Sequence, residues 1–208
     1  MNVASLVHCT PEAEKLIVRM ARVSNPANAN NDETAPRLLR YLIKHQHWSP
    51  FEMASMCVEI QTERDIAAQI LRHRSFSFQE FSTRYAKTGL AEVPKWRSQD
   101  EKNRQASHDD LDKEVIQQFD RQTAVLLRNI YLTYEEMLQA GVAKECARRI
   151  LPLCTPTTIY MHGTLRSWIH YIQLRAGSET QLEHRKIAIA CHDIFAKQFP
   201  VIAEAAFA

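Results

Sequence analysis

Apolar side chains recur at helical spacing in several stretches of the chain. The clearest is the stripe formed by Ile116, Phe119, Thr123 and Leu127, which continues to Gly141 and predicts the longest helix. Gly141 is the expected stop signal of that helix. The expected helices cover a segment after Pro11 and the ranges 34–45, 64–74, 116–141, 164–174 and 180–198.

One segment alternates as a strand does. Between residues 53 and 61, Ala54, Met56, Val58 and Ile60 share one face while polar side chains take the other. A shorter β segment is expected over 157–161, a loop over 25–32, and a polar, flexible excursion over about 91–112. The expected order is helices, a strand, helices, a β segment and helices. This order favours a single α+β domain spanning residues 1–208 over a regular βαβ winding.

Composition narrows the class of protein. The 208 residues, 45% of them hydrophobic, suffice for one substantial core. The 26 Lys and Arg nearly balance the 24 Asp and Glu, which disfavours a general nucleic-acid binder. Neither a signal peptide nor a membrane-spanning stretch is expected. Five cysteines without paired or zinc-type spacing fit a reducing cytoplasm, and we expect no metal site.

Charged and hydrogen-bonding side chains are concentrated between Gln69 and Tyr85. This segment holds three arginines (72, 74 and 84), His73, Glu80 and several hydroxyls, whereas the chain's four glycines form no phosphate-binding loop. A guanidinium group can bind phosphate oxygens through two parallel hydrogen bonds, and amides and hydroxyls can form hydrogen bonds with the edge of a heterocycle. The residue types in this segment therefore indicate a nucleotide-binding site. Two other interpretations are cations that complement a helix dipole, and an Arg and Phe surface that stacks on single-stranded nucleic acid.

One motif in this segment resembles the signature of flavin-dependent thymidylate synthases. It consists of Arg72-His73-Arg74, seven further residues, Ser82 and Arg84-Tyr85. The resemblance covers nearly the whole chain. Its other segments, in the family's order, are Ala21–Ser24, His45–Glu52, Lys144–Arg148 with Ile150–Pro152, and Leu174–Ala176.

This resemblance implies a fold, a reaction and an assembly. The fold would be a small central sheet flanked by several helices. The enzyme would methylate dUMP to dTMP, with methylenetetrahydrofolate as carbon donor and NADPH as reductant through tightly bound FAD, and would release tetrahydrofolate. It would be a homotetramer with active sites at subunit interfaces. It would lie in the cytoplasm, or in the host cytoplasm if the protein is viral. Neither nucleic acid nor a membrane would be a partner.

The resemblance also assigns site residues. Positions matching the flavin site are Ser24, His47, Ser49, Arg72, His73, Arg74, Glu80, Thr164, Leu165, Arg166 and His170, and His47 is also associated with the folate pocket. Positions matching the dUMP site are Gln69, Ile70, Leu71, Arg72, Glu80, Phe81, Ser82, Thr83, Arg84, Arg148 and Arg175. Thr164 and His170 stand where some family members carry asparagine, and both can still form hydrogen bonds.

Activation of uracil carbon 5 has two chemical routes. A thiolate can add at carbon 6, and Cys146 lies near Lys144 and Arg148, although a small apolar residue inside a helix is the more ordinary interpretation of that cysteine. Alternatively, a cation beside N3 and O4 stabilises negative charge on the ring, and the resemblance places Arg175 there as the catalytic residue.

The remaining polar and aromatic groups are given binding or packing roles. Ser82 is expected to bind the nucleotide, because its spacing shows no Ser-His-Asp arrangement. Trp168, Tyr171 and Ile172 are expected in the core. Three rival functions remain open: a nucleotide-binding module without catalysis, a protein that binds single-stranded nucleic acid, and another flavoprotein that consumes NADPH without making dTMP.

Overall fold

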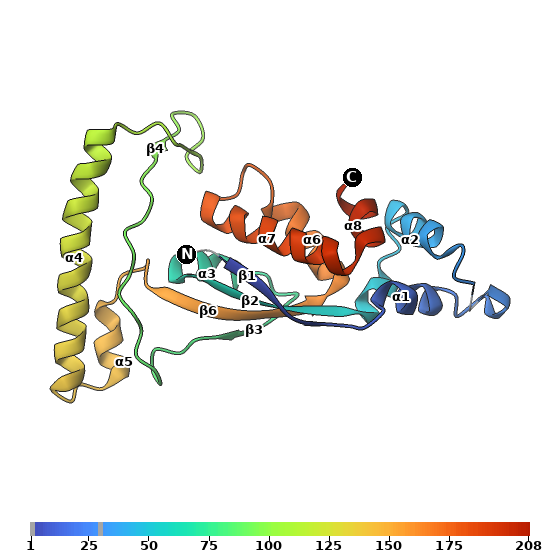
Figure 1. Cartoon of the computed structure of the whole chain (residues 1–208), viewed down its shortest axis with the longest axis horizontal. Helices are drawn as coiled ribbons and strands as arrows, with labels where there is room; N and C mark the ends of the chain where they lie inside the picture. Colours follow the sequence, from blue (N-terminus) through green and yellow to red (C-terminus); the bar gives the residue numbers. More distant parts are fainter. Residues whose placement is uncertain (1–2, 29–30) are drawn as a thin grey trace. The chain divides into compact units, whose positions relative to one another are not determined.

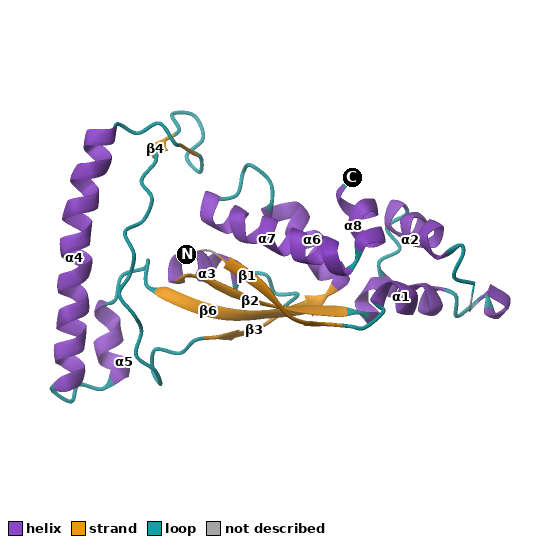
Figure 2. Cartoon of the chain, in the orientation of Figure 1, coloured by secondary structure: helices purple, strands orange, loops and turns teal. Residues whose placement is uncertain are grey.

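The computed structural model describes residues 3–28 and 31–208 as mixed helices and strands, which confirms the α+β class. Residues 29 and 30 of the predicted 25–32 loop lie outside the described residues. The helices are α1 (Ala13–Ala21), α2 (Ala35–Lys44), α3 (Arg64–Ile70), α4 (Lys113–Gln139), α5 (Lys144–Ala147), α6 (Leu165–Arg175), α7 (Leu182–Gln198) and α8 (Pro200–Phe207), with short 3-10 turns η1 (Pro26–Asn28), η2 (Ser49–Met53) and η3 (Arg148–Ile150) (Figure 2).

Four strands form the main sheet, in the order β1-β2-β6-β3. They are β1 (Val3–Cys9), β2 (Ser55–Glu63), β6 (Pro156–Thr164) and β3 (Ser77–Glu80). A separate antiparallel pair, β4 (Ser98–Gln99) and β5 (Ser107–His108), lies in the predicted 91–112 excursion, with Ser98 opposite His108. The expected strand at 53–61 and β segment at 157–161 are therefore confirmed as β2 and β6.

Contacts divide the chain into two compact units. Unit 1 comprises residues 61–70 and 80–159, and unit 2 comprises the other described residues up to 60, together with 71–79 and 160–208. Strands β2 and β6 run through both units. A single domain spanning 1–208 stays a prediction.

Unit 2 packs helices on sheet strands. Helix α6 lies beside α7, α7 packs on β1, and α2 packs on α8 (Figure 1). The alternation predicted for β2 is confirmed, because Ala54, Met56, Val58 and Ile60 are at most 1% exposed. Trp168 of α6 is fully buried on this strand, and its indole N–H donates to the carbonyl of Met56 at 2.9 Å.

Unit 1 contains the longest helix, α4, as predicted. Asp112 caps it by accepting the backbone N–H of Glu114 at 2.7 Å, and Gly141 just beyond its end has φ 83°, a left-handed conformation that favours glycine. The predicted stripe is only partly buried: Leu127 and Tyr134 are covered, whereas Phe119 is 45% exposed.

Several elements were not predicted, among them β1, β3 and α8, and one helix is shorter than expected. Helix α3 ends at Ile70 instead of residue 74, because the chain turns over 71–75 to enter β3. β1 and β3 were missed. α8 was not predicted either; it begins at Pro200, and proline is favourable in the first turn of a helix. The carboxylate of Glu14 accepts the N–H groups of Val201 and Ile202 at 2.8 and 2.9 Å, which supports that start.

Within the described ranges, no helix is both long enough and apolar enough to cross a membrane.

Candidate active site

Arg175 and His73, 102 residues apart in the sequence, meet in unit 2. Arg175 is the last residue of α6, and His73 lies in the turn before β3. The Nε–H of Arg175 donates to Nε2 of His73 at 3.0 Å. Because a guanidinium has no acceptor, Nε2 of His73 must carry the lone pair, and the proton of the neutral ring lies on Nδ1. The hydrogen bond therefore requires a neutral His73.

The surroundings of His73 favour this neutral form. Burial, followed by the nearby charges of Arg175 and Arg72, lowers the pKa of His73 to about 4. His184 of α7 is fully buried, and burial, then Arg175 and His73, lowers its pKa to about 4 as well. Two neutral imidazoles thus lie close to one permanent cation.

These two histidines predict a pH dependence of stability. Their pKa values in the folded chain lie below the ordinary value of 6.5, so the unfolded chain binds more protons between pH 6.5 and 4. Their contribution is fully present above pH 6.5 and is lost as the pH falls toward 4. We expect the free energy of unfolding, measured by urea titration, to fall over this range, and to fall less in His184→Gln. His192→Gln, at a partly exposed histidine beside Asp193, is the control and should retain the wild-type slope.

The residues at the start of α6 form local contacts. The hydroxyl of Thr164 accepts the N–H of Ser167 at 3.3 Å and so caps the helix, and Leu165 is fully buried. Arg166 pairs with Glu52 at 2.8 Å. The ring of His170 lies 5.0 Å from that of Trp48. Of these predicted flavin residues, Leu165 is buried as a whole residue, and its backbone N–H donates to the carbonyl of Ala54 at 2.9 Å.

The other predicted flavin residues of unit 2 are exposed or lie at turns. Ser24 follows α1, Ser49 begins η2, and the ring of His47 lies 5.9 Å from that of Tyr41. Arg72 and Arg74 are exposed and, within the described part of the chain, neither forms an ion pair. Two exposed guanidinium groups without an acidic partner suit a phosphorylated ligand.

Unit 1 holds Glu80 at the end of β3. Its carboxylate accepts the hydroxyl of Thr157 at 3.0 Å and lies 3.7 Å from Nη1 of Arg64. The next residue, Phe81, donates its N–H to the carbonyl of Thr158 at 2.9 Å, which ties the segment to β6. Gln69 and Ile70 close α3, with Ile70 fully buried, and Leu71 is 36% exposed.

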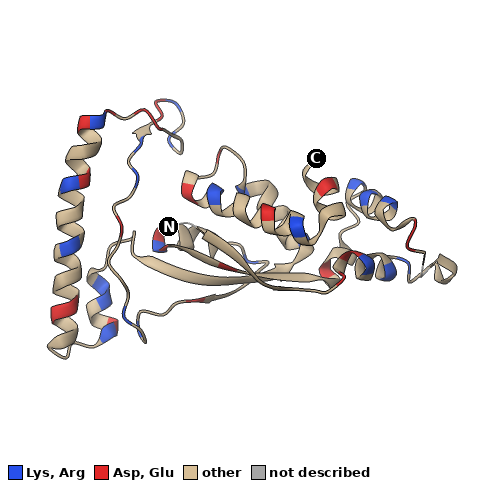
Figure 3. Cartoon of the chain, viewed as in Figure 1, with Lys and Arg blue, Asp and Glu red and all other residues tan. Residues whose placement is uncertain are grey.

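Arg148 and Arg84 form contacts within unit 1, at the segment 80–84. Nη1 of Arg148 donates to the hydroxyl of the buried Thr83 at 3.5 Å, and Arg84 pairs with Glu145 at 3.2 Å. Figure 3 shows basic residues on α5 and the η3 turn that follows it, and residues of both charges on α4. The predicted nucleotide residues 80–84 and Arg148 are thus brought together, although they lie 64 or more positions apart.

The side chain of Ser82 forms a local hydrogen bond. Its hydroxyl accepts the N–H of Arg84 at 3.4 Å, and His108, the histidine of unit 1, is paired with Asp100. We expect Ser82→Ala to retain measurable dTMP formation, with its main effect on KM for dUMP, in line with a binding role. Steady-state kinetics and equilibrium dUMP binding check this. Complete loss of turnover with unchanged dUMP affinity would instead support a nucleophilic serine.

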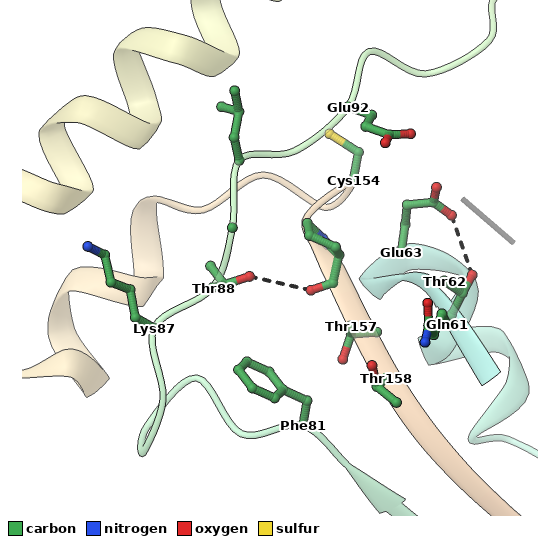
Figure 4. Close-up of a pocket in the computed structure, with 13 residues that line it drawn as sticks. Gln61, Thr62, Glu63, Phe81, Lys87, Thr88, Glu92, Cys154, Thr157 and Thr158 are labelled. Carbon is green, nitrogen blue, oxygen red and sulfur yellow. Dashed lines mark hydrogen bonds between the residues drawn. The ribbon is translucent and has the colours of Figure 1, made fainter. Parts of the chain in front are cut away.

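Unit 1 also contains a hollow of about 350 Å³ (Figure 4). Phe81 is the one predicted nucleotide residue that lines it, together with Thr88, Thr157 and Cys154. The hydroxyl of Thr88 donates to the carbonyl of Pro156 at 3.5 Å and holds the wall formed by residues 87–90 against β6.

The exposure of Cys146 and the burial of His184 were not predicted from the sequence. Cys146 lies in α5 but is exposed, so its interpretation as a buried apolar residue was wrong; α5 has four residues, and Ala147 is the one it buries. His184 was not predicted as a site residue. The signal was present, because His184 shares helical spacing with Ile187, Ala188 and Cys191, the buried stripe of α7.

The comparisons with known proteins agree with this fold. The chain resembles the crystal structure of a UMP/dUMP methylase, PolB of Streptomyces cacaoi, bound with 5-Br dUMP: the TM-score is 0.88 at 28% identity, over 99% of this chain and 94% of that one. It is 53% identical to a probable flavin-dependent thymidylate synthase of Paramecium bursaria Chlorella virus 1, over 93% of this chain and 90% of the relative. It is 51% identical to the flavin-dependent thymidylate synthase of Synechocystis, over 92% and 88%.

The fold is that of an α+β protein, and both of its compact units carry exposed arginine side chains, Arg72 and Arg74 in one unit and Arg84 in the other. The model of the thymidylate synthase complementing protein family matches residues 5–201. The chain therefore belongs to this family, the flavin-dependent thymidylate synthases, which confirms the resemblance found in the sequence.

Proposed function

We propose that this protein is an FAD-dependent thymidylate synthase that methylates dUMP to dTMP. Methylenetetrahydrofolate supplies the carbon, NADPH supplies the reducing equivalents, and tetrahydrofolate is released. The observation that carries the proposal is family membership over residues 5–201, with about half of all positions identical to two relatives of that name.

The contact between Arg175 and His73 supports a catalytic role for Arg175. Its Nε is occupied by His73, and this hydrogen bond fixes the plane of the guanidinium group. The two terminal nitrogens of that group then lie where they donate to O4 of uracil and, once N3 has lost its proton, to N3, and the negative charge on this part of the ring makes carbon 5 nucleophilic. An always-charged, planar donor stabilises this charge but does not itself accept the proton of N3.

The polar groups of unit 1 support a role in binding the nucleotide. Arg84 and Arg148 provide guanidinium donors for the phosphate of dUMP, and Ser82 and Thr83 provide hydroxyls beside them. Because the Arg84–Glu145 pair is exposed, exchanging this partner for a phosphate costs little.

The donors of unit 2 fit a flavin dinucleotide. Arg72 and Arg74 would hold its diphosphate, and Ser24, His47, Ser49, Arg166 and His170 would contribute hydrogen bonds or ring contacts. When bound, FAD supplies the two-electron chemistry that no protein side chain can provide.

The test of this function is the visible absorption spectrum of the purified protein, followed by anaerobic NADPH and then dUMP with methylenetetrahydrofolate. We expect a yellow protein that bleaches with NADPH, regains its colour with both substrates and yields dTMP. Bound flavin without dTMP would favour another flavoprotein activity. A colourless protein that FAD cannot reconstitute would overturn the proposal and leave a nucleotide-binding module or a single-strand binder, the latter marked by affinity that falls steeply with salt.

We also propose a homotetramer with active sites completed by neighbouring subunits. Helix α4 supports it: Phe119 and Leu126 are 45% and 58% exposed, Val125 and Leu132 are 61% and 46% exposed, and the members of each pair lie seven positions apart, so each pair shares a face of the helix. We expect Leu126→Glu to dissociate the assembly and abolish turnover, measured by light scattering and dTMP formation. Gln117→Glu, an exposed position on the opposite side of the same helix from Leu126, is the matched control and should stay tetrameric. A fully active monomer would refute the interfacial site.

A cytoplasmic location, or the host cytoplasm if the protein is viral, is proposed from the cysteines. All five are free thiols, as expected in a reducing compartment.

A further inference from the structure

His184 and Tyr171 form a buried polar pair between α7 and α6. His184 is 0% exposed and Tyr171 is 1% exposed. Nε2 of His184 lies 3.2 Å from the hydroxyl of Tyr171, within hydrogen-bond distance. The two helices pack side by side (Figure 1). A buried hydroxyl without a partner is costly, so this hydrogen bond fixes the ring of Tyr171 relative to α7.

The ring of Tyr171 connects this pair to His73. The two ring centroids lie 4.9 Å apart with an interplanar angle of 84°, an edge-to-face contact. On another side, Nε of Arg175 donates to His73 at 3.0 Å. Tyr171 and Arg175 are four positions apart on α6 and therefore lie on the same face of the helix. His73 is thus held between the two.

The arginine side chain has several rotatable bonds, so its direction depends on what its nitrogens contact. Here Nε contacts a ring that can rotate unless Tyr171 holds it, and Tyr171 is itself held by His184. Burial favours the neutral form of both histidines, so the whole set of contacts persists at neutral pH without a second cation beside Arg175.

We propose that His184 is a positioning residue for the methylation of dUMP: through Tyr171 and His73 it holds the guanidinium group of Arg175 in its working orientation. This inference rests on the proposed function of the site. It assigns His184 an effect on turnover and on nucleotide binding, beyond its contribution to packing, because small misplacements of a catalytic group have large effects on rate.

The test compares His184→Leu, His184→Gln and Tyr171→Phe with the wild type. Ile187→Val, an equally buried substitution on α7, is the matched control. We measure kcat and KM for dUMP, flavin bound per chain and the melting temperature. We expect His184→Leu and Tyr171→Phe to lower kcat/KM about ten- to a hundredfold, with flavin content unchanged. The double variant should be no worse than either single variant, since both break one chain of contacts. His184→Gln, which keeps a hydrogen-bonding group, should recover much of the loss.

A purely structural role for His184 gives a different result. If the wild type makes dTMP, and His184→Leu lowers the melting temperature while its flavin-loaded protein matches Ile187→Val in kcat and KM, His184 is a structural residue only and the inference is wrong. If His184→Leu does not fold, Tyr171→Phe decides the question by the same kinetic criterion. A wild type that binds flavin but forms no dTMP overturns the proposed function, and this inference with it.

Discussion

Arg175→Lys is expected to lower the rate of dTMP formation by roughly 10²–10³, the loss that follows removal of a well-placed donor to a developing negative charge. Lysine keeps the charge but lacks both the Nε–H that donates to His73 and the planar pair of terminal nitrogens. Flavin content should be unchanged. Anaerobic reoxidation of the reduced flavin by dUMP and methylenetetrahydrofolate, with dTMP quantified, measures the effect.

Arg40→Lys is the matched control for this experiment. Arg40 belongs to the same unit and pairs with Glu204 at 2.8 Å, but both side chains are about half exposed, so the substitution should change neither rate nor stability appreciably. Wild-type turnover in Arg175→Lys would remove Arg175 from the mechanism. An equal loss in both variants would indicate a general sensitivity to arginine replacement.

Trp168→Ala is expected to have the largest effect on stability, about 3–5 kcal/mol, because it removes the largest fully buried side chain of the core. The substitution also leaves the carbonyl of Met56 without its donor, and it removes the ring that packs 4.9 Å from Phe76. A loss of this size is a large part of the 5–15 kcal/mol that stabilises a typical domain. Urea unfolding monitored by circular dichroism measures it.

Two further substitutions separate cavity formation from the lost hydrogen bond. Trp168→Phe keeps most of the apolar volume and should cost about 1–3 kcal/mol, mainly for the lost hydrogen bond to the carbonyl of Met56. Trp96→Phe is the control, since its indole N–H donates to Asp120 at an exposed position, and it should cost well under 1 kcal/mol. If Trp168→Ala proved no more destabilising than Trp96→Phe, Trp168 would not be the core residue that its burial indicates.

Phe76 shows how tightly this core borders the site. It lies three residues after His73, and its ring packs beside both Trp168 and Tyr171. A Cβ atom added to Gly163 of β6 would come within 2.5 Å of this ring. Only glycine fits there, because β6 and the aromatic cluster approach more closely than any side chain allows.

The sequence by itself determined the elements whose signals are local. The alternation in 53–61 and the long helical stripe ending at Gly141 each predict a structure from neighbouring positions alone, and both are confirmed. The ordered motifs identified the family and therefore the reaction. The α+β class followed from the order of these elements.

The tertiary structure decided what depends on distant partners. β3 is four residues long and is a strand only because β6 supplies its hydrogen bonds, and α8 begins at Pro200 with Glu14 of α1 binding its first N–H groups. The pairing of Arg175 with His73 joins positions 102 residues apart, and the hydrogen bond between His184 and Tyr171 joins two helices. No local pattern encodes such contacts, because packing alone brings these side chains within hydrogen-bond distance.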